Sequence, residues 1–467
     1  MPTLVQPLSS FLSAVETFQR LANLPGCLFL DSALPHETLG RYSFVTADPF
    51  DQLSVVVGDP MAFDRLARFV GRYTAQPLPN LPPFQGGVAG LFSYDLNRSI
   101  EELPAPACDQ FALPAIHVGL YDVVVAFDHL TQEAWLISQG FPETSDAART
   151  DRAAARMSQF QQWLSESPIS GCPSHSAPSL STTTSRIMGP HYSLERMPSL
   201  FSNFTRANYL AAVQHIVDYI HSGDIFQANF SQRLLMPAKD AAADLYLRLR
   251  NQNPAPFAGY YQGGDFQIAS ASPERFVRID NGRVEARPIK GTRPRTRLPE
   301  ADLYTGEELR ASEKDQAENV MIVDLMRNDL SRVCQMDSIR VEQLCQVENY
   351  QFVQHLVSSV VGKLLPHRTA VDLLVAAFPG GSITGAPKIR AMQIITELEP
   401  HARGAYCGSL GYIGFSGQTD LSILIRTITA AQGWWQLPVG GGIVAQSKPQ
   451  AEYDETWHKA EGILRSL

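Results

Sequence analysis

The dense succession of strand and helix patterns between Phe204 and Leu467 limits the possible folds more than any other feature of the chain. Apolar residues in 209–220 recur at the spacing of one helix face, and Gly223 is suited to end that helix. In 226–231, apolar and polar residues alternate, which is typical of a strand with one buried face. Later strand patterns follow one another at hairpin spacing. The sequence therefore predicts an α+β fold with large, mostly antiparallel sheets and helices on the outside.

The rest of the chain is organised more loosely. Residues 1–140 form an N-terminal region with one helical pattern near 61–73. Its β-rich runs are 27–30, 53–57, 115–127 and 134–138. A polar helix pattern at 145–164 and a segment rich in Ser, Pro and Thr at 165–201 predict a helix and linker over 141–203. The strongly patterned region 204–467 follows.

Composition excludes several classes of function. The chain of 467 residues has a net charge of −9 with its basic residues clustered, which argues against a general nucleic-acid binder. The 6 cysteines show no metal-ligand spacing and are expected to be free thiols in a reducing compartment. The first residues show no signal-peptide pattern, and no apolar run approaches membrane-spanning length. We therefore predict a cytoplasmic protein with no nucleic-acid or membrane partner.

One lysine lies among arginines in a loop that glycine and proline constrain. Lys290 is flanked by Arg287, Arg293 and Arg295. Nearby positive charge disfavours protonation of an amine, and a neutral lysine can act as a nucleophile in covalent catalysis. The turn signal at 280–282, between two strand patterns, places the lysine near a strand end on rigid scaffold. The alternative is a basic surface loop, which is the more common meaning of such a cluster taken alone.

A set of carboxylates is typical of a magnesium site. Glu452 and Glu455 lie three residues apart in a C-terminal helical pattern, so both face one way, with Lys459 on the same side. A second helical pattern offers Glu318 or Asp315, and spacing alone does not choose between them. Three carboxylates and several waters suit Mg²⁺. The alternative is a solvated acidic helix face.

Two glycine-rich segments can hold an anion. Residues 379–388, which include Thr384 and Gly385, precede a helical pattern, and the N–H groups at a helix start bind carboxylate or phosphate. The three glycines of 440–442 allow a ligand to approach the backbone closely. Either segment could instead be a tight turn.

Three further side chains lie in apolar settings that suggest chemistry. Arg426 lies in so apolar a strand pattern that its guanidinium must be paired, either with a protein carboxylate, the commoner case, or with a substrate carboxylate. Glu274 ends an apolar strand pattern and is a candidate general acid with a raised pKa, or else a structural hydrogen-bonding residue. His355 is a candidate for polarising a ligand, or else a core histidine.

Together these segments resemble the chorismate-utilising enzymes over essentially the whole chain. The motifs that carry the resemblance are 225–231, 272–276, 318–329, 381–388 and 440–455. The residue before Gly291 distinguishes members of the family: anthranilate synthase large subunits typically have alanine there. The lysine of this chain resembles the aminodeoxychorismate synthases, which begin the route to 4-aminobenzoate and folate. The resemblance implies that the sheets pack as a sandwich.

The resemblance also implies a mechanism and a partner. Mg²⁺ held by Glu318, Glu452 and Glu455 would neutralise the ring carboxylate of chorismate. Lys290 would attack ring C2 while Glu274 protonates the departing C4 hydroxyl, and ammonia would then add at C4 and expel the lysine. No glutaminase motif is present, so a separate glutamine amidotransferase subunit would deliver the ammonia. The residues implied to bind substrate are Thr292, His355, Thr384, Gly385, Arg426, Gly440, Gly441, Gly442 and Lys459.

Relatives use part of the N-terminal region as a tryptophan pocket, which in anthranilate synthases is a feedback site. The matching residues are Ser32, Leu39, Gly40, Arg41, Tyr42, Pro256, Phe257 and Ala258. Asp31 stands where the motif more usually has glutamate, and simple strand packing is the alternative. Two other functions stay open. One is an anthranilate synthase that tolerates Lys290, and the other is a non-catalytic chorismate-binding regulator, against which the intact set of chemical residues argues.

Overall fold

Two large sheets form the framework of the protein. The computed structural model describes residues 3–8, 12–34, 39–166, 189–194, 197–295, 299–349 and 353–467. Within these residues the strands form sheets of 13 and 10 strands, and neighbouring strands are antiparallel. The predicted fold class, with large antiparallel sheets and helices, is confirmed.

Both sheets combine strands from the N-terminal region with strands from beyond residue 204. The larger sheet runs in the order β1 (Leu4–Pro7), β8 (Glu133–Ser138), β7 (Val123–Asp128), β3 (Tyr42–Thr46), β2 (Leu28–Asp31), β12 (Phe257–Gln262), β13 (Phe266–Ser272), β22 (Thr427–Ala431), β23 (Trp434–Ile443), β11 (Gln227–Pro237), β10 (Met197–Ser202) and β9 (Tyr192–Leu194), with β19 (Gly385–Ala386) on β11. The smaller sheet runs in the order β16 (Ile289–Pro294), β18 (Val353–Lys363), β15 (Arg283–Ala286), β14 (Arg275–Asp280), β21 (Thr419–Ile423), β20 (Ser409–Gly414), β5 (Gly87–Phe92), β6 (Ile116–Tyr121) and β4 (Asp51–Val55), with β17 (Arg340–Asn349) on β18.

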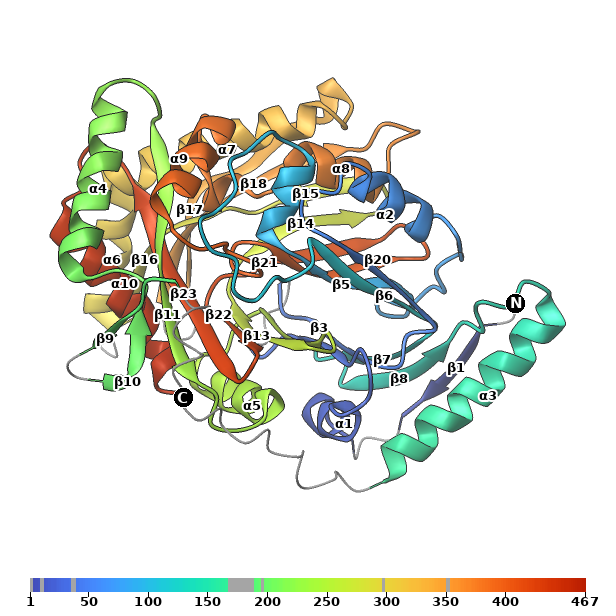
Figure 1. Cartoon of the computed structure of the whole chain (residues 1–467). Coiled ribbons are helices and arrows are strands. Elements are labelled where there is room, and N and C mark those ends of the chain that lie inside the picture. The colour runs from blue at the N-terminus through green and yellow to red at the C-terminus, as the bar shows by residue number, and fades with distance from the viewer. Residues whose placement is uncertain are drawn as a thin grey trace.

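Helices cover the outer faces of the two sheets (Figure 1). The smaller sheet carries α2 (Ala62–Val70), α7 (Glu313–Ser331) and α8 (Ala370–Ala377), and the larger sheet carries α1 (Ala14–Leu21), α3 (Asp146–Ser165) and α5 (Ala242–Gln252). The remaining helices are α4 (Arg206–His221), α6 (Pro299–Ala311), α9 (Lys388–Leu398) and α10 (Pro449–Leu464), with short 3-10 turns η1 (Tyr94–Ser99), η3 (Met336–Ser338) and η4 (Gly381–Ile383). No helix within the described residues has the length and apolar composition needed to cross a bilayer.

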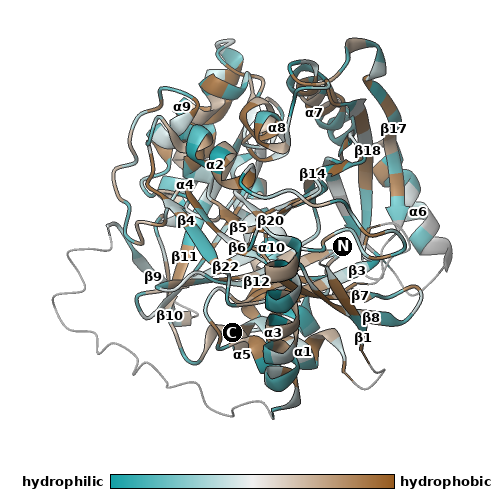
Figure 2. Ribbon diagram, turned by 90° about the vertical axis from the view of Figure 1, so that its right-hand side faces the viewer, coloured by the Kyte–Doolittle hydropathy of each residue, from teal (hydrophilic) through white to brown (hydrophobic). Residues whose placement is uncertain are grey.

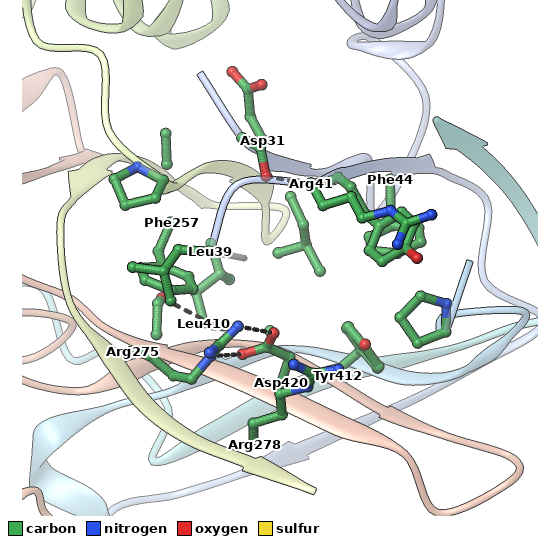
Figure 3. Close-up of a pocket in the computed structure, with 18 residues that line it drawn as sticks. Asp31, Leu39, Arg41, Phe44, Phe257, Arg275, Arg278, Leu410, Tyr412 and Asp420 are labelled. Atoms are coloured by element: carbon green, nitrogen blue, oxygen red, sulfur yellow. Dashed lines mark hydrogen bonds and ion pairs between the residues drawn. The ribbon is translucent and has the colours of Figure 1, made fainter. Parts of the chain in front are cut away.

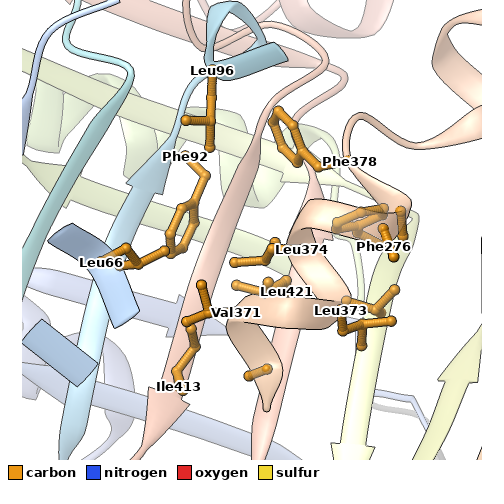
Figure 4. Packing of buried hydrophobic residues seen from close by; sticks show 14 of the residues in the cluster. Leu66, Phe92, Leu96, Phe276, Val371, Leu373, Leu374, Phe378, Ile413 and Leu421 are labelled. Carbon is orange, nitrogen blue, oxygen red and sulfur yellow. The ribbon is translucent and has the colours of Figure 1, made fainter. Parts of the chain in front are cut away.

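Separate apolar clusters fill the layers. In Figure 4, Val371, Leu373 and Leu374 of α8 lie over strand residues of the smaller sheet, among them Phe92 and Leu421. A second cluster lies between the larger sheet and its helices, and a third lies between the two sheets. Much of α3 is hydrophilic in Figure 2, because this helix buries only the stripe that faces the sheet. Apolar side chains therefore pack against both faces of each sheet.

Several local predictions are confirmed, because short-range rules decide them. The turn between β14 and β15 has positive φ at Asn281 (50°) and Gly282 (76°), as a two-residue hairpin requires. The helix predicted from 209–220 is α4, capped by the Thr205 side chain. The polar helix predicted from 145–164 is α3, capped by Ser145. Ser312 caps α7, the helix that offers Glu318.

Tertiary packing changes three other predictions. The run 115–127 is two strands, β6 and β7, because the chain passes from one sheet to the other at the buried Asp122. The strand predicted to be buried on one face, β11, is buried on both, since polar groups cover its polar face. The linker prediction for 165–201 falls partly on 167–188 and 195–196, outside the described residues, but β9 and β10 there form a hairpin that extends the larger sheet.

Candidate active site

Lys290 is the second residue of β16, close to the strand end that the hairpin signal predicted. Its Nζ donates a hydrogen bond to the main-chain oxygen of Ser382, 2.8 Å away. A bulge in the pairing of β16 with β18 follows the lysine, and Gly291 has φ +71° there. A Cβ at Gly291 would lie 2.7 Å from Leu309 and 2.9 Å from Asp315. Glycine at this position therefore permits both the bulge and the approach of the helices α6 and α7.

Burial, not arginine crowding, lowers the pKa of Lys290. Desolvation is the largest influence; Glu318 and Glu274 oppose it, and the positive charge of Lys459 assists it. The predicted cause was wrong, because each flanking guanidinium is held by a carboxylate. These pairs are Arg287 with Glu348, Arg293 with Asp315 at 3.3 Å, and Arg295 with Asp302 at 2.6 Å. The predicted consequence, a lysine shifted toward its neutral form, agrees with the structure.

Glu274 lies in the short link between β13 and β14 and is 4% exposed. Its desolvation raises the pKa of the carboxyl to about 7, although the Ser382 hydroxyl, the Lys290 charge and the Ile289 backbone lower it in that order. Within the part of the chain that the structure describes, Oε1 of Glu274 has no hydrogen-bond partner of normal geometry. A carboxyl with this pKa and a free oxygen is suited to give a proton near neutral pH.

Ser382 is a site residue for which the sequence suggested no separate role. It lies in η4, where its main-chain oxygen receives Lys290 and its hydroxyl lies beside Glu274 without a normal hydrogen bond. The turn is held by Arg403, which donates to the main-chain oxygen of the next residue, Ile383, at 3.1 Å. Arg403 is itself paired with Glu399 in a buried ion pair of 2.7 Å. This network fixes the turn against the two candidate catalytic side chains.

The three acidic residues predicted to hold Mg²⁺ come from two helices. Glu318 projects from α7, and Glu452 and Glu455 project from α10. Burial raises the pKa of Glu318, while Lys290 and Lys314 oppose that shift and Glu452 adds to it. Burial also raises the pKa of Glu455, but Lys459 outweighs it and the net shift is downward.

The donor set fits Mg²⁺ in kind, since the ion prefers carboxylate and water oxygens. However, no three His, Cys, Asp or Glu side chains within the described residues stand in a preassembled metal cluster. Lysines hold two of the acids: Lys314 lies 3.4 Å from Glu452, and Lys459 lies 2.7 Å from Glu455. The ligand assignment therefore stays a prediction.

Arg426 is the clearest candidate for binding an anion. Its guanidinium makes no hydrogen bond or ion pair with any residue that the structure describes, so the commoner of the two predicted partners, a protein carboxylate, is absent among these residues. Burial lowers the pKa of Arg426, and its backbone has φ +52°, which is uncommon for a residue other than glycine. A desolvated guanidinium without a protein partner is suited to a substrate carboxylate.

His355 lies near this arginine and is 2% exposed. Its pKa falls to about 3, because burial and the Arg426 charge both disfavour the protonated ring, while a hydrogen bond with the Gly291 backbone opposes the shift. The ring is therefore neutral at physiological pH. Thr292 follows Gly291 and pairs with His355 in the ladder of β16 and β18.

The two glycine-rich segments contribute differently from what was predicted. Thr384 donates its hydroxyl to the Gly380 oxygen at 3.1 Å, and Gly385 pairs with Ala228 as part of β19. These groups therefore take part in the fold of the loop, and their contact with substrate stays a prediction. Pro387 immediately precedes α9.

The glycines of β23 face the candidate site. A Cβ at Gly441 would lie 3.3 Å from both Glu455 and Lys459, and one at Gly442 would lie 2.3 Å from Gln227 Nε2. The Gly440 oxygen accepts a hydrogen bond from Lys459 at 2.9 Å. Because these glycines have no side chains, Glu455, Lys459 and Gln227 can lie directly against the backbone of β23.

Gln227 is a second site residue that sequence reasoning passed over. Its side chain is 1% exposed, yet neither its amide oxygen nor its nitrogen has a hydrogen-bond partner among the described residues. It lies at Gly442 and near Glu318. The only signal in the sequence was its place in an alternating strand, which predicted exposure and hid its burial in the site.

The predicted tryptophan pocket coincides with a separate cavity of about 300 Å³ (Figure 3). The predicted residues that line it are Ser32, Leu39, Arg41, Tyr42, Pro256, Phe257 and Ala258, while Gly40 does not. Arg275 crosses its floor to Asp420, with hydrogen bonds of 2.9 and 3.0 Å. Asp31 also lines the cavity, but its carboxylate is turned away and accepts hydrogen bonds from Tyr246 at 2.9 Å and Arg250 at 2.5 Å.

Comparison with known proteins identifies the group to which this architecture belongs. A family model described as chorismate binding enzyme matches residues 28–465. The chain belongs to the chorismate-binding enzyme family. This family member is 40% identical to aminodeoxychorismate synthase component 1 of Salmonella typhimurium, over 97% of this chain and 96% of the relative. It is 41% identical to anthranilate synthase component 1 of Thermus thermophilus, over 83% and 79% of the two chains.

Solved structures agree with the family assignment. Anthranilate synthase component I from Streptococcus pneumoniae matches with a TM-score of 0.75 and 30% identity, over 92% of this chorismate-binding enzyme and 93% of that chain. The antiparallel framework predicted from the sequence is therefore the framework of this family. Relatives with two different names lie at similar identity, so the residues of the site must distinguish between reactions.

Proposed function

We propose that this chain is the synthase subunit that converts chorismate and ammonia to 4-amino-4-deoxychorismate, a precursor of 4-aminobenzoate and folate. The observation that carries the proposal is the position of Lys290. Its amine is desolvated and donates a hydrogen bond to the Ser382 main-chain oxygen, 2.8 Å away. Its charge also interacts with those of Glu274 and Glu318. Anthranilate synthases typically have alanine at this position. A lysine placed in the site gives this chain a nucleophile that such an enzyme lacks.

In the proposed reaction, neutral Lys290 forms a bond from Nζ to ring C2. The ring double bonds shift, the C4–O bond breaks, and Glu274 transfers its proton to the oxygen, which leaves as water. Ammonia then forms a bond to C4 while the C2–N bond breaks and returns the lysine. Two displacements of this kind have lower barriers than one direct displacement. The raised pKa of Glu274 and the lowered pKa of Lys290 favour the protonation states that the first step needs.

Two cationic side chains, Arg426 and Lys459, support a dicarboxylate substrate. The Arg426 guanidinium has no protein anion among the described residues, and we assign one carboxylate of chorismate to it. Lys459 lies beside the backbone of 440–442, close to Glu455, and supplies a second cation. Mg²⁺ bound by Glu318, Glu452 and Glu455 would neutralise the ring carboxylate there.

We also propose that a separate glutamine amidotransferase subunit delivers the ammonia. The name of the Salmonella relative, component 1, implies a second component. The aromatic and cationic lining of the cavity in Figure 3 fits an aromatic amino acid such as tryptophan, which we propose as its occupant.

The deciding experiment incubates purified protein with chorismate, Mg²⁺ and an ammonium salt and identifies the product by mass. We expect aminodeoxychorismate. Anthranilate with pyruvate would support the second candidate, an anthranilate synthase, which the similarity to the Thermus relative favours. Binding of chorismate with no product would leave the regulator.

A further inference from the structure

Lys314 links the two helices that carry the acidic residues. It lies in the first turn of α7, and its Nζ lies 3.4 Å from Oε1 of Glu452 on α10. The same oxygen accepts a hydrogen bond from the Ser447 hydroxyl at 2.6 Å. The lysine side chain is 42% exposed and the glutamate 5% exposed. A partly exposed ammonium therefore neutralises a carboxylate that is almost fully buried.

Lysines offset the negative charge of the carboxylates in this region: the charge of Lys290 acts on Glu318, and ion pairs hold the other two acids. Glu318, Glu452 and Glu455 bring three negative charges, and Lys314 and Lys459 each pair with one of them. Without these lysines, the carboxylates would repel one another in a partly desolvated space. The protein thus carries its own positive charges where a divalent cation is expected.

The two lysines differ in how firmly they are held. Lys459 pairs with Glu455 at 2.7 Å and also donates to the Gly440 oxygen at 2.9 Å. Lys314 has the longer contact, of 3.4 Å, and its long stem reaches solvent. Moving Lys314 away from its carboxylate therefore costs less free energy than moving Lys459 away from Glu455.

We propose that Lys314 is an exchangeable counter-cation, which holds Glu452 until a divalent cation replaces it and thereby weakens the binding of that cation. The inference rests on the metal ligands of the proposed function. Mg²⁺ binds carboxylate oxygens at about 2.0–2.1 Å, and an ammonium that shares the same oxygen would repel it. Lys314 must therefore move from Glu452 when the metal binds. The exchange gives Glu452 a positive partner both with and without the metal. The buried carboxylate is therefore not left unpaired before the metal binds.

The test titrates Mg²⁺ alone into chelator-treated protein by calorimetry at fixed ionic strength. Lys314→Met removes the charge and keeps most of the stem, and we expect its Kd for Mg²⁺ to fall about two- to tenfold. Lys314→Arg keeps the charge and should retain the wild-type Kd. Lys363→Met, an exposed lysine on β18, is the matched control and should change nothing.

Glu452→Gln shows whether the titration reports this site, and it should weaken Mg²⁺ binding. An unchanged Kd in Glu452→Gln, or an unchanged or higher Kd in folded Lys314→Met, overturns the inference. Because neither chorismate nor ammonia is present, these results are independent of which product the enzyme makes. Far-ultraviolet circular dichroism and thermal unfolding verify that each variant is folded.

Discussion

Replacing Glu274 with glutamine tests two properties of this carboxyl: its role as a proton donor and the effect of its burial on the stability of the fold. The substitution preserves the shape of the side chain but removes the proton that the carboxyl would give to the C4 oxygen. With its pKa raised to about 7, roughly half of Glu274 is protonated at neutral pH, whereas the ordinary value of 4.5 would leave about one molecule in 300 protonated. A positioned general acid contributes about 10²–10⁴-fold. We expect Glu274→Gln to slow formation of the Lys290 adduct by a factor in that range.

The assay is a single-turnover experiment. Enzyme in excess is mixed with chorismate and Mg²⁺ without ammonia, quenched at intervals and analysed by intact mass and peptide mapping. The wild-type rate should fall as pH rises through about 7, because the acid loses its proton, while the need for neutral Lys290 acts in the opposite direction. The Gln variant should lose the falling limb and keep the rising one. An unchanged rate in the variant removes Glu274 from the acid role.

The same variant should be more stable above neutral pH. The folded-state pKa of Glu274 lies above its unfolded value, so the folded state binds the extra proton and stability falls as pH rises from about 4.5 to 7. A shift from 4.5 to about 7 corresponds to about 3 kcal/mol, which is lost in full above pH 7. Thermal unfolding at pH 8 should therefore show a higher Tm for Glu274→Gln than for the wild type. A lower Tm at pH 8 would contradict burial as the cause of the raised pKa.

Three further results are expected. Lys290→Ala should lose most amination with either ammonia or glutamine plus the partner subunit, as measured by product mass; undiminished turnover would refute the nucleophile assignment. Arg426→Gln should raise KM for chorismate about 10–100-fold, since a charge-assisted hydrogen bond contributes about 1.5–3 kcal/mol, and an unchanged KM would show that the guanidinium does not bind substrate. Protein stripped of bound ligand should release heat on titration with tryptophan, and Tyr42→Ala should abolish it; no heat with the wild type would exclude tryptophan as the occupant of the cavity.

Short-range patterns predicted the elements that depend on neighbouring residues. The hairpin at Asn281 and Gly282 and the helix α4 follow from turn chemistry and periodicity, which act within a few residues. Glu452 and Glu455 were placed on one helix for the same reason. The order of the motifs also predicted the family. That prediction came from similarity to known sequences and not from the physical properties of the residues.

Residues far apart in the chain decided the rest. The pKa of Lys290 could not be derived from its neighbours in sequence, because the arginines beside it are paired with distant acids and desolvation controls the amine. Gln227 looked exposed because alternation reports one strand, whereas its burial comes from Gly442 of the next strand and from α7.

The sequence alone determined which elements form and which side chains can take part in the chemistry, because local backbone preferences and residue type are properties of short segments. Only the tertiary structure decided which charges are neutralised and which stay unpaired. That distinction depends on burial and on partners from distant parts of the chain: Lys314 is paired with Glu452 of another helix, whereas Arg426 has no partner among the described residues.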